Sequence, residues 1–193
     1  MIRLPVVTWL LERWRRRRRQ PTREARAPRG PPIFVPEAVL GETVRLLRTF
    51  GGSQKPHEGI VYWAGVEGRR AWSVTTCLVP DARTTPGSYE TSVMANAQII
   101  GWLAERGLNL LAQVHTHPGR SVDHSDGDLA GAFMAFPGSL SVVVPNYGRN
   151  GMLPFWSCGI HRYGPAGYRR LSREEIETEI RLIPILADLR SKG

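Results

Sequence analysis

The chain has 193 residues, of which 41% are hydrophobic and 22% charged, as expected for one globular domain of ordinary size with a tail. Two cysteines, Cys77 and Cys158, exclude a disulfide framework and a cysteine-rich zinc module, and no apolar run reaches the ~18–20 residues that span a bilayer. The net charge of +9 is uneven: residues 1–29 hold ten arginines and two glutamates, hence +8. The body is therefore nearly neutral, and its charge gives no reason to expect DNA binding.

The N-terminal tail combines an apolar stretch, Leu4–Leu11, with an arginine block at 15–19. A secretory signal carries its charge before the apolar stretch, so we expect a cytoplasmic protein. The tail could bind an anionic membrane surface, at ~1 kcal/mol per basic residue, or nucleic acid. It could also be a solvated extension, or the product of a start codon placed too far upstream.

Five prolines within 20–36 predict a stiff linker, so we assign 1–33 to a disordered tail and linker and 34–193 to the globular domain.

The apolar pattern of that domain predicts alternating strands and helices. In chain order these are a helix over 37–50, strands over 59–65 and 71–79 joined by a turn at Glu67-Gly68, a helix over 89–106, a strand over 110–117, a short helix over 126–136, strands over 140–145 and 155–163, and a last helix from Ser172 to about 190, interrupted at Pro184. The helix over 89–106 is expected to bury one face made of Val93, Met94, Ala97, Ile100, Leu103 and Ala104. This order predicts a mixed α/β sandwich or α+β fold rather than a doubly wound one.

One stretch, residues 114–128, gathers most of the chemistry-bearing side chains. His115 and His117 are two residues apart at the end of a predicted strand, so both imidazoles face the same side. Asp128 returns near a predicted helix start and adds a carboxylate. Two histidines and one carboxylate, with a fourth position left to water, are typical of catalytic rather than structural zinc. Taken singly, a His-x-His pair on a strand and a Ser125-x-x-Asp128 capping box are both common.

Together these residues resemble the signature of the JAMM (JAB1/MPN/Mov34) metalloprotease family. That signature is a glutamate, then His-x-His-Pro, six residues and Ser-x-x-Asp; the chain gives His115-Thr116-His117-Pro118, residues 119–124 and Ser125-Asp126-Gly127-Asp128. The upstream glutamate is assigned to Glu58, which precedes Gly59, because the rival Glu67 falls in the predicted hairpin turn. The resemblance covers roughly 35–165 and implies a central mixed sheet flanked by helices, similar to cytidine deaminases.

The resemblance also implies roles for five residues. One zinc ion per chain would be held by His115, His117 and Asp128 and would lower the pKa of its bound water toward ~7. Glu58 would accept that proton and pass it to the leaving amine, and Ser125 would donate a hydrogen bond to the oxyanion. No small-molecule cofactor is implied. The family pattern skips three residues between the ligands, to which we assign no ligand role: Asp123, His124 and Asp126. His161, in a late strand, is expected to be packed or at the surface.

The implied substrate is a ubiquitin-like protein, because family members with all five residues hydrolyse peptide or isopeptide bonds, typically after a Gly-Gly tail. Arginine outnumbers lysine 24 to 2, as in GC-rich bacterial genomes. The chain is similar to compact bacterial members found in ubiquitin-like conjugation, in antiphage defence operons and in sulfur-carrier pathways. The short segment between Ser139 and Phe155 leaves little space for the insertions that grip a second ubiquitin. The loop over 81–90 is either a surface loop or a site that grips an extended tail by strand addition.

Two other functions stay open at this point. The first is a non-catalytic scaffold, as in family members that have lost ligands, although this chain retains all five residues. The second is a branch associated with DNA repair, which shares both halves of the motif. That branch usually shows His-Asn-His-Pro-Ser-Gly and a preceding helix-hairpin-helix module, whereas this chain has Thr116 and Gly119-Arg120.

Overall fold

The structure, a computed structural model, describes residues 31–51, 55–130 and 133–185. The predicted tail up to residue 30 and the end of the predicted last helix, 186–193, lie outside these ranges. The elements are β1 (Ile33–Pro36), α2 (Glu37–Leu47), β2 (Ile60–Glu67), β3 (Trp72–Leu78), β4 (Ala82–Thr85), β5 (Ser88–Thr91), α3 (Val93–Arg106), β6 (Asn109–Thr116), α4 (Asp126–Ala130), β7 (Leu140–Val144), β8 (Gly159–Gly164), β9 (Gly167–Arg170), α5 (Arg173–Glu179) and β10 (Ile180–Ile183), with 3₁₀ turns at Asn146–Gly148 and Phe155–Ser157. Among the described helices, none is long and apolar enough to cross a bilayer.

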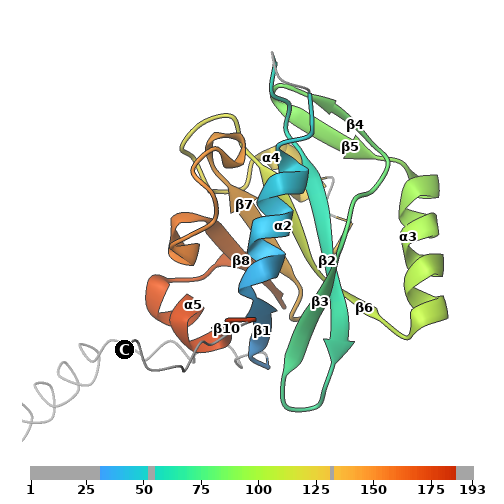
Figure 1. Cartoon of the computed structure of the whole chain (residues 1–193), viewed down its shortest axis with the longest axis vertical. Coiled ribbons are helices and arrows are strands. Elements are labelled where there is room, and N and C mark those ends of the chain that lie inside the picture. The colour runs from blue at the N-terminus through green and yellow to red at the C-terminus, as the bar shows by residue number, and fades with distance from the viewer. Residues whose placement is uncertain (1–30, 52–54, 131–132, 186–193) are drawn as a thin grey trace, which may run out of the picture.

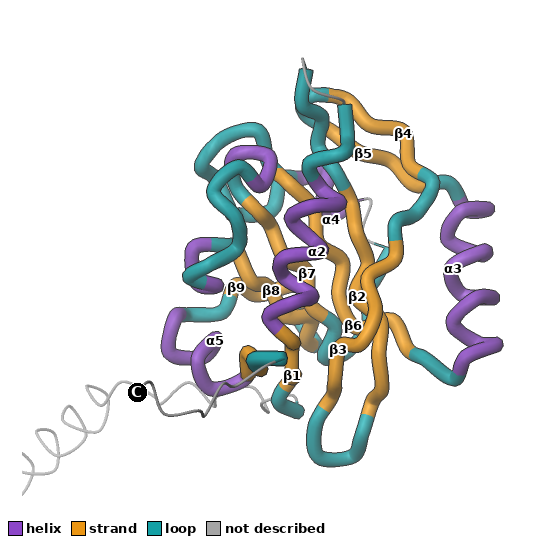
Figure 2. Tube along the Cα trace, in the orientation of Figure 1, coloured by secondary structure: helices purple, strands orange, loops and turns teal. Residues whose placement is uncertain are grey.

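Most of the described strands form one curled mixed sheet in the order β10-β1-β3-β2-β6-β7-β8-β9 (Figure 1). The sheet is mixed at its centre. The strand β2 runs antiparallel to both of its neighbours, β3 and β6, whereas β6 and β7 run parallel to each other. The hairpin β4–β5 forms a separate two-stranded sheet at one end of the molecule, just before α3 (Figure 2). The predicted class, a mixed α/β fold with a central sheet and flanking helices, is confirmed.

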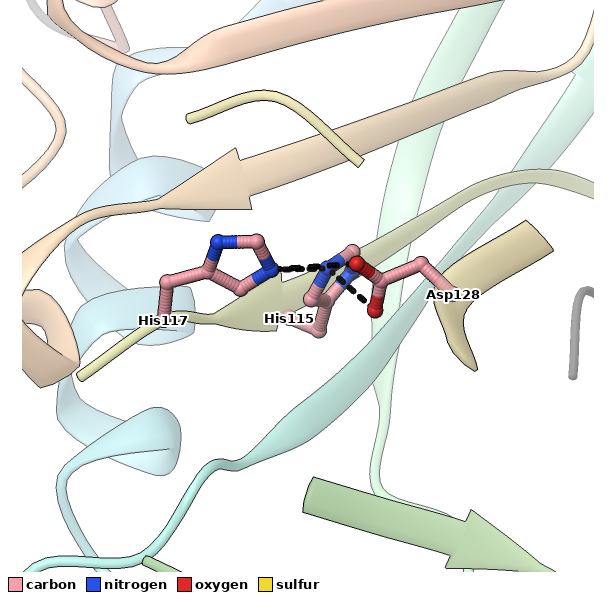
Figure 3. A group of neighbouring side chains, drawn as sticks. All are labelled: His115, His117 and Asp128. Carbon is pink, nitrogen blue, oxygen red and sulfur yellow. Dashed lines mark hydrogen bonds and ion pairs between the residues drawn. The ribbon is translucent and has the colours of Figure 1, made fainter. Parts of the chain in front are cut away.

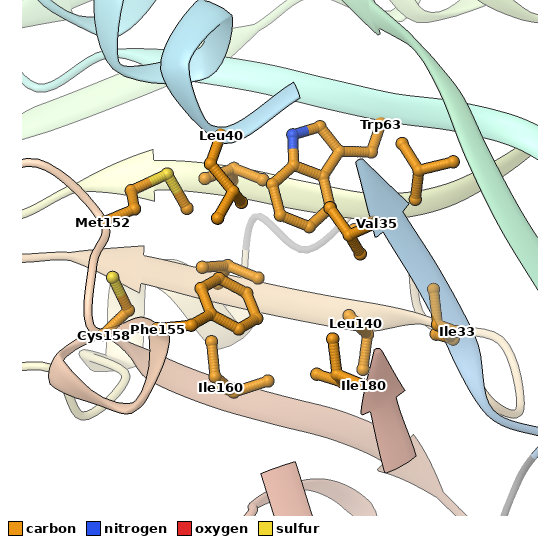
Figure 4. Close-up of a cluster of buried hydrophobic side chains, with 14 of the residues drawn as sticks. Ile33, Val35, Leu40, Trp63, Leu140, Met152, Phe155, Cys158, Ile160 and Ile180 are labelled. Atoms are coloured by element: carbon orange, nitrogen blue, oxygen red, sulfur yellow. The ribbon is translucent and has the colours of Figure 1, made fainter. Parts of the chain in front are cut away.

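The sheet separates two hydrophobic clusters, and β2 contributes to both because its side chains alternate between faces. Val61 and Trp63 point to the side covered by α2, where they join a large cluster with Leu40, Phe155 and Met152 (Figure 4). Ile60, Tyr62 and Ala64 of β2 point to the side covered by α3, where they join a smaller cluster with Leu103 and Leu110. Both faces of the central strands are therefore buried, and β6 is held rigidly between them.

The predicted helix over 89–106 is wrong at its start and in its buried face. Residues 88–91 form β5, and the helix begins after Ser92, whose hydroxyl accepts a hydrogen bond from the Ala95 amide at 3.0 Å. Leu103 of the predicted face is buried as expected, but Val93 and Met94 are 88% and 70% exposed. Ala95, which the prediction left out, is buried instead. The periodic apolar residues lie mainly on the outer face, because α3 contacts the sheet with the neighbouring stripe of its surface.

The predicted last helix is also shorter than expected. α5 starts as predicted with a capping box between Ser172 and Glu175, but it ends at Glu179. Ile180–Ile183 instead forms β10, which pairs in parallel with β1 at the edge of the sheet. The β-branched Ile180 and Ile183 favour an extended backbone, and the partner strand lies about 150 residues upstream. The domain reaches at least to Pro31, whose carbonyl accepts a hydrogen bond from Arg162 at 3.1 Å.

Candidate active site

The end of β6 positions both histidines of the motif. His115 pairs with Ile60 of β2 and with Val143 of β7, so it lies in the middle of the sheet. His117 follows the strand, and its amide donates to the Val144 carbonyl at 2.9 Å, which extends the parallel ladder by one residue. Because strand side chains alternate, both rings project to the same side.

Asp128 comes from the first turn of the short helix α4. The Ser125 amide donates to Asp128 Oδ2 at 2.7 Å, and the Asp128 amide donates to Ser125 Oγ at 3.2 Å, so the capping-box interpretation of Ser125-x-x-Asp128 holds as well as the ligand one. The loop before α4 passes so close to β8 that a Cβ on Gly159 would lie 1.8 Å from the Val122 carbonyl oxygen. Only glycine at this position lets the loop bring α4 back over the end of β6.

The three side chains converge on one point (Figure 3). His115 Nε2 lies 3.1 Å from Asp128 Oδ1, His117 Nε2 lies 3.1 Å from Asp128 Oδ2, and the two Nε2 atoms are 3.3 Å apart. All three residues are buried, and their candidate ligand atoms lie within 4.8 Å of one another. A metal ion replaces direct contacts of this kind with bonds of ~2.0–2.2 Å to each donor.

The charges in this cluster suit a divalent cation. Burial lowers the pKa of His115, which keeps its ring neutral and therefore able to ligate. Burial alone would raise the pKa of Asp128, but hydrogen bonds with His115 and His117 outweigh it and hold the pKa well below its usual range. The His117 Nδ1–H donates to the Ser121 carbonyl at 3.2 Å, which leaves Nε2 as the free ligand atom. The residues thus fit a metal ion.

Comparisons with known proteins agree with this interpretation. "Probable metalloprotease y4jG" of Sinorhizobium fredii is 40% identical over 121 residues, which cover 61% of this chain and 73% of that relative. The chain belongs to the JAMM/MPN metalloprotease family. The resemblance stated from the motif is therefore confirmed, and with it the expectation of a metal-dependent hydrolase.

A solved structure with a TM-score of 0.60 shows the same fold. The solution structure of a protein from Desulfitobacterium hafniense has a TM-score of 0.60 at 15% identity and covers 80% of this chain and 94% of that one. The crystal structure of a JAB1/MPN domain protein from Archaeoglobus fulgidus has a TM-score of 0.43 at 14% identity, covering 80% of this chain and 99% of that one. No family model matches the chain.

The structure brings Glu58, rather than Glu67, to the cluster formed by the two histidines and Asp128. Glu58 lies two residues before β2, whose first residue pairs with His115, whereas Glu67 ends the same strand at its far side. Gly59 lets the Phe50 ring pack directly against the backbone that follows Glu58, since a Cβ on this residue would lie 2.5 Å from that ring. Burial raises the pKa of Glu58 to about 7, opposed by His117 and reinforced by Asp128. A carboxyl group with this pKa suits proton transfer near neutral pH.

A cleft of about 330 Å³ opens beside the cluster. Glu58, Ser125 and Asp128 line one side, and Gly87–Thr91 of the β4–β5 hairpin lines the other. The Ser125 hydroxyl faces this cleft and donates to Asp128 Oδ2 at 2.7 Å. A carboxyl group, a hydroxyl group and a cluster that could hold a metal ion therefore meet at one open cavity, which is the arrangement that hydrolysis of a carbonyl compound needs.

The residues that the motif skips stay away from the cluster's ligand atoms. Asp123 forms an ion pair with Arg170 at 2.7 Å on the surface, and Asp126 is exposed in the first turn of α4. The His124 ring stacks on that of His161, with centroids 3.9 Å apart, and its Nε2 lies 2.8 Å from Ser141 Oγ. Burial lowers the pKa of His124 to about 3, so it is a neutral, packed side chain. His161 is packed as well, at 4% exposure.

Three cleft residues were not anticipated from the sequence: Thr91, Asn96 and Phe133. Tyr89 falls in the segment 81–90 that was considered for gripping a tail; it belongs to β5, and its ring lies 5.1 Å from that of His115. The Asn96 side chain accepts a hydrogen bond from the Tyr62 hydroxyl at 3.2 Å, a contact that depends on how α3 packs against β2. Only the tertiary structure reveals these residues.

Proposed function

We propose that the protein is a cytoplasmic zinc-dependent peptidase or isopeptidase that cleaves after the C-terminal tail of a ubiquitin-like protein. The reaction would either process a precursor or release the modifier from a conjugate, in a bacterial ubiquitin-like conjugation system such as one used in antiphage defence. The observation that carries the proposal is the convergence of His115, His117 and Asp128 beside Glu58 at an open cleft. The arginine-rich tail would contact an anionic surface, either membrane or nucleic acid.

The donor set favours zinc, because two imidazoles and one carboxylate are typical of catalytic zinc sites. Zinc bound there would supply a Lewis acid and lower the pKa of a bound water to about 7. Glu58 would take a proton from the attacking water and return it to the leaving amine, which its pKa of about 7 permits in both directions. Ser125 would stabilise the oxyanion once its hydroxyl turns from Asp128 toward the cleft.

The β4–β5 hairpin supports an extended substrate. It is a two-stranded sheet, so β5 pairs with no described strand other than β4 and keeps its second edge, and it lies along the cleft. An unpaired edge can bind an extended peptide through backbone hydrogen bonds with little demand on its side chains. A narrow tail such as Gly-Gly fits this mode, because the absence of side chains lets the backbone approach closely. The segment over 81–90, which was predicted as a loop, thus contains the hairpin proposed to bind the tail of the substrate.

The scaffold alternative gains no support from the site. A protein that only binds partners has no need for three buried ligand side chains or for a carboxyl group held near neutral pKa. We therefore rank hydrolysis first and treat a metal-free scaffold as the outcome that the following experiment can reveal.

The test compares wild type, Glu58→Gln, His117→Ala and Glu67→Gln. Elemental mass spectrometry should find about one zinc per chain except in His117→Ala. Cleavage of a ubiquitin-like protein fused through its Gly-Gly tail should be lost in Glu58→Gln and His117→Ala but kept in Glu67→Gln, the matched control. A chelator should inhibit, and added zinc should restore activity. Wild type without zinc, even after reconstitution, would leave the scaffold as the better explanation.

A further inference from the structure

The loop that follows β7 has an unusual backbone next to the metal cluster. Asn146 and Tyr147 have φ of 55° and 53°, a region that residues with a side chain seldom occupy and that bulky residues rarely enter. Two amides of this loop fix it to the motif: Asn146 donates to the Gly119 carbonyl and Tyr147 donates to the His117 carbonyl, both at 2.9 Å. The loop is therefore built onto the residues that carry the ligands.

This backbone directs the Tyr147 side chain across to the β4–β5 hairpin. Its hydroxyl donates to the Pro86 carbonyl at 2.6 Å, a contact between residues 61 positions apart. The other side of the loop is held by Arg48, whose guanidinium donates to the Gly148 and Arg149 carbonyls at 2.9 and 2.8 Å. The phenol is thus fixed at its base and reaches out to the hairpin turn.

The hairpin turn has a second attachment, to the proposed base. The Glu58 amide donates to the Thr85 carbonyl at 2.8 Å, so the consecutive carbonyls of Thr85 and Pro86 are bound by the two sides of the site. Within the turn, the Thr85 and Ser88 hydroxyls are 2.8 Å apart. Because Gly87–Thr91 forms a wall of the cleft, these two attachments help to set the distance between that wall and the ligands, together with the contact of 3.1 Å between His57 Nδ1 and Thr84 Oγ1.

We propose that Tyr147 is a positioning residue, whose hydroxyl holds the β4–β5 hairpin at the rim of the cleft and thereby determines affinity for an extended substrate. The inference rests on the proposed function, because it takes the tail of a ubiquitin-like protein as the occupant of the cleft. Tyr147 does not line the cleft, so it acts through the hairpin rather than by touching substrate. Without the hydroxyl, the turn keeps its attachment to Glu58 but becomes free to move away from His117.

The first test measures the attachment without any substrate. Hydrogen–deuterium exchange of the full chain is compared among wild type, Tyr147→Phe and Tyr163→Phe. Tyr163 is the matched control, since its hydroxyl has no hydrogen bond within the described ranges. Residues 82–91 should exchange about fivefold faster in Tyr147→Phe, as expected for the loss of one hydrogen bond in a local opening, and the central strands should not change. Equal exchange in the hairpin would overturn the inference.

The second test separates binding from chemistry with two probes. One is ubiquitin with a C-terminal coumarin amide, and the other is acetyl-Gly-Gly-coumarin amide, which is too short to follow β5. Tyr147→Phe should raise KM for the long probe about fivefold with kcat and metal content unchanged, and it should leave cleavage of the short probe unaltered. A fall in kcat on both probes would show that Tyr147 acts on the metal site, and would overturn the inference.

A third variant distinguishes the hydroxyl from the backbone. Asparagine accepts positive φ far better than tyrosine, so Tyr147→Asn removes the phenol while keeping the loop conformation. It should raise exchange of 82–91 and KM as Tyr147→Phe does; wild-type behaviour in Tyr147→Asn would refute a role for the hydroxyl. If wild type cleaves neither probe, the proposed function has failed, and the exchange experiment still decides whether Tyr147 holds the hairpin.

Discussion

Replacing Glu58 with glutamine should change how the stability of the metal-free protein depends on pH. Burial raises the pKa of Glu58 from 4.5 to about 7, so between these values the folded chain keeps a proton that the unfolded chain has lost. The free energy of unfolding therefore falls as pH rises through this window. Above pH 7 the folded chain carries a charge in an unfavourable site, and Glu58→Gln removes that charge without changing the size of the side chain.

The magnitude follows from the same pKa difference. A carboxyl group whose pKa rises from 4.5 to about 7 destabilises the fold by at most about 3.5 kcal/mol, at about 1.4 kcal/mol for each pH unit of difference. The residue is only 6% exposed, but its carboxyl group faces an open cleft, where solvent screens the charge. We therefore expect Glu58→Gln to be about 1–2 kcal/mol more stable relative to wild type at pH 8 than at pH 5.

Urea unfolding of both proteins at pH 5 to 8.5, with chelator present, measures this difference. Titration of the neighbouring histidines is common to both proteins and largely cancels, although the charge of Glu58 also raises the pKa of His117. Repeating the series with zinc gives a control, because a bound cation favours the carboxylate and should shrink the difference. A stability difference that stays constant across the pH range would refute the reasoning, since it would place the Glu58 pKa near its ordinary value.

Three further outcomes are expected. His117→Ala should lower metal content from about one ion per chain to near zero by elemental mass spectrometry, with an unchanged far-ultraviolet circular dichroism spectrum. Leu103→Ala should destabilise the fold by about 2–5 kcal/mol, whereas the exposed Val93→Ala should change stability by less than about 0.5 kcal/mol, as urea unfolding can show; equal effects would restore the predicted buried face. Arg162→Ala should cost about 3–5 kcal/mol in the same assay, because it leaves the buried Glu179 carboxyl group without its ion-pair partner, which lies 3.2 Å away.

The metal-ligand set could be proposed from the sequence because its members lie close together in the chain. Strand alternation places His115 and His117 on one side, and the spacing to Asp128 is a family signature. Glu58 is different, since it lies 57 residues before His115 and reaches the cluster through the antiparallel register of β2 and β6. The amino-acid pattern alone contains no trace of that register, so only the family resemblance pointed to Glu58.

The errors arose where the pairing or packing partner of a segment, rather than its local apolar pattern, decides the structure. Ile180–Ile183 followed a helical pattern but pairs with β1 near the start of the domain. Residues 89–91 were merged with the predicted helix, although β5 pairs with the adjacent strand over 82–85 and forms the cleft wall. In α3 the apolar spacing predicted the helix correctly but not which of its faces packs against the sheet. Periodicity identifies a row of apolar side chains along a helix, but not the part of the protein that the row contacts.

The two walls of the cleft differ in how firmly the fold holds them. The ligands stand at the end of a strand that is buried on both faces, so their geometry is set by the core and is resistant to change. The opposite wall of the cleft is a small hairpin that contacts the site through the Glu58 amide, the Tyr147 hydroxyl and the Tyr89 ring. Substitutions in the hairpin other than at Tyr89 can therefore alter which tail is bound without disturbing the metal cluster. For this reason, we expect the chemistry of the protein to be readable from residues 115–128, and its specificity to depend on residues 82–91 and their attachment to Tyr147.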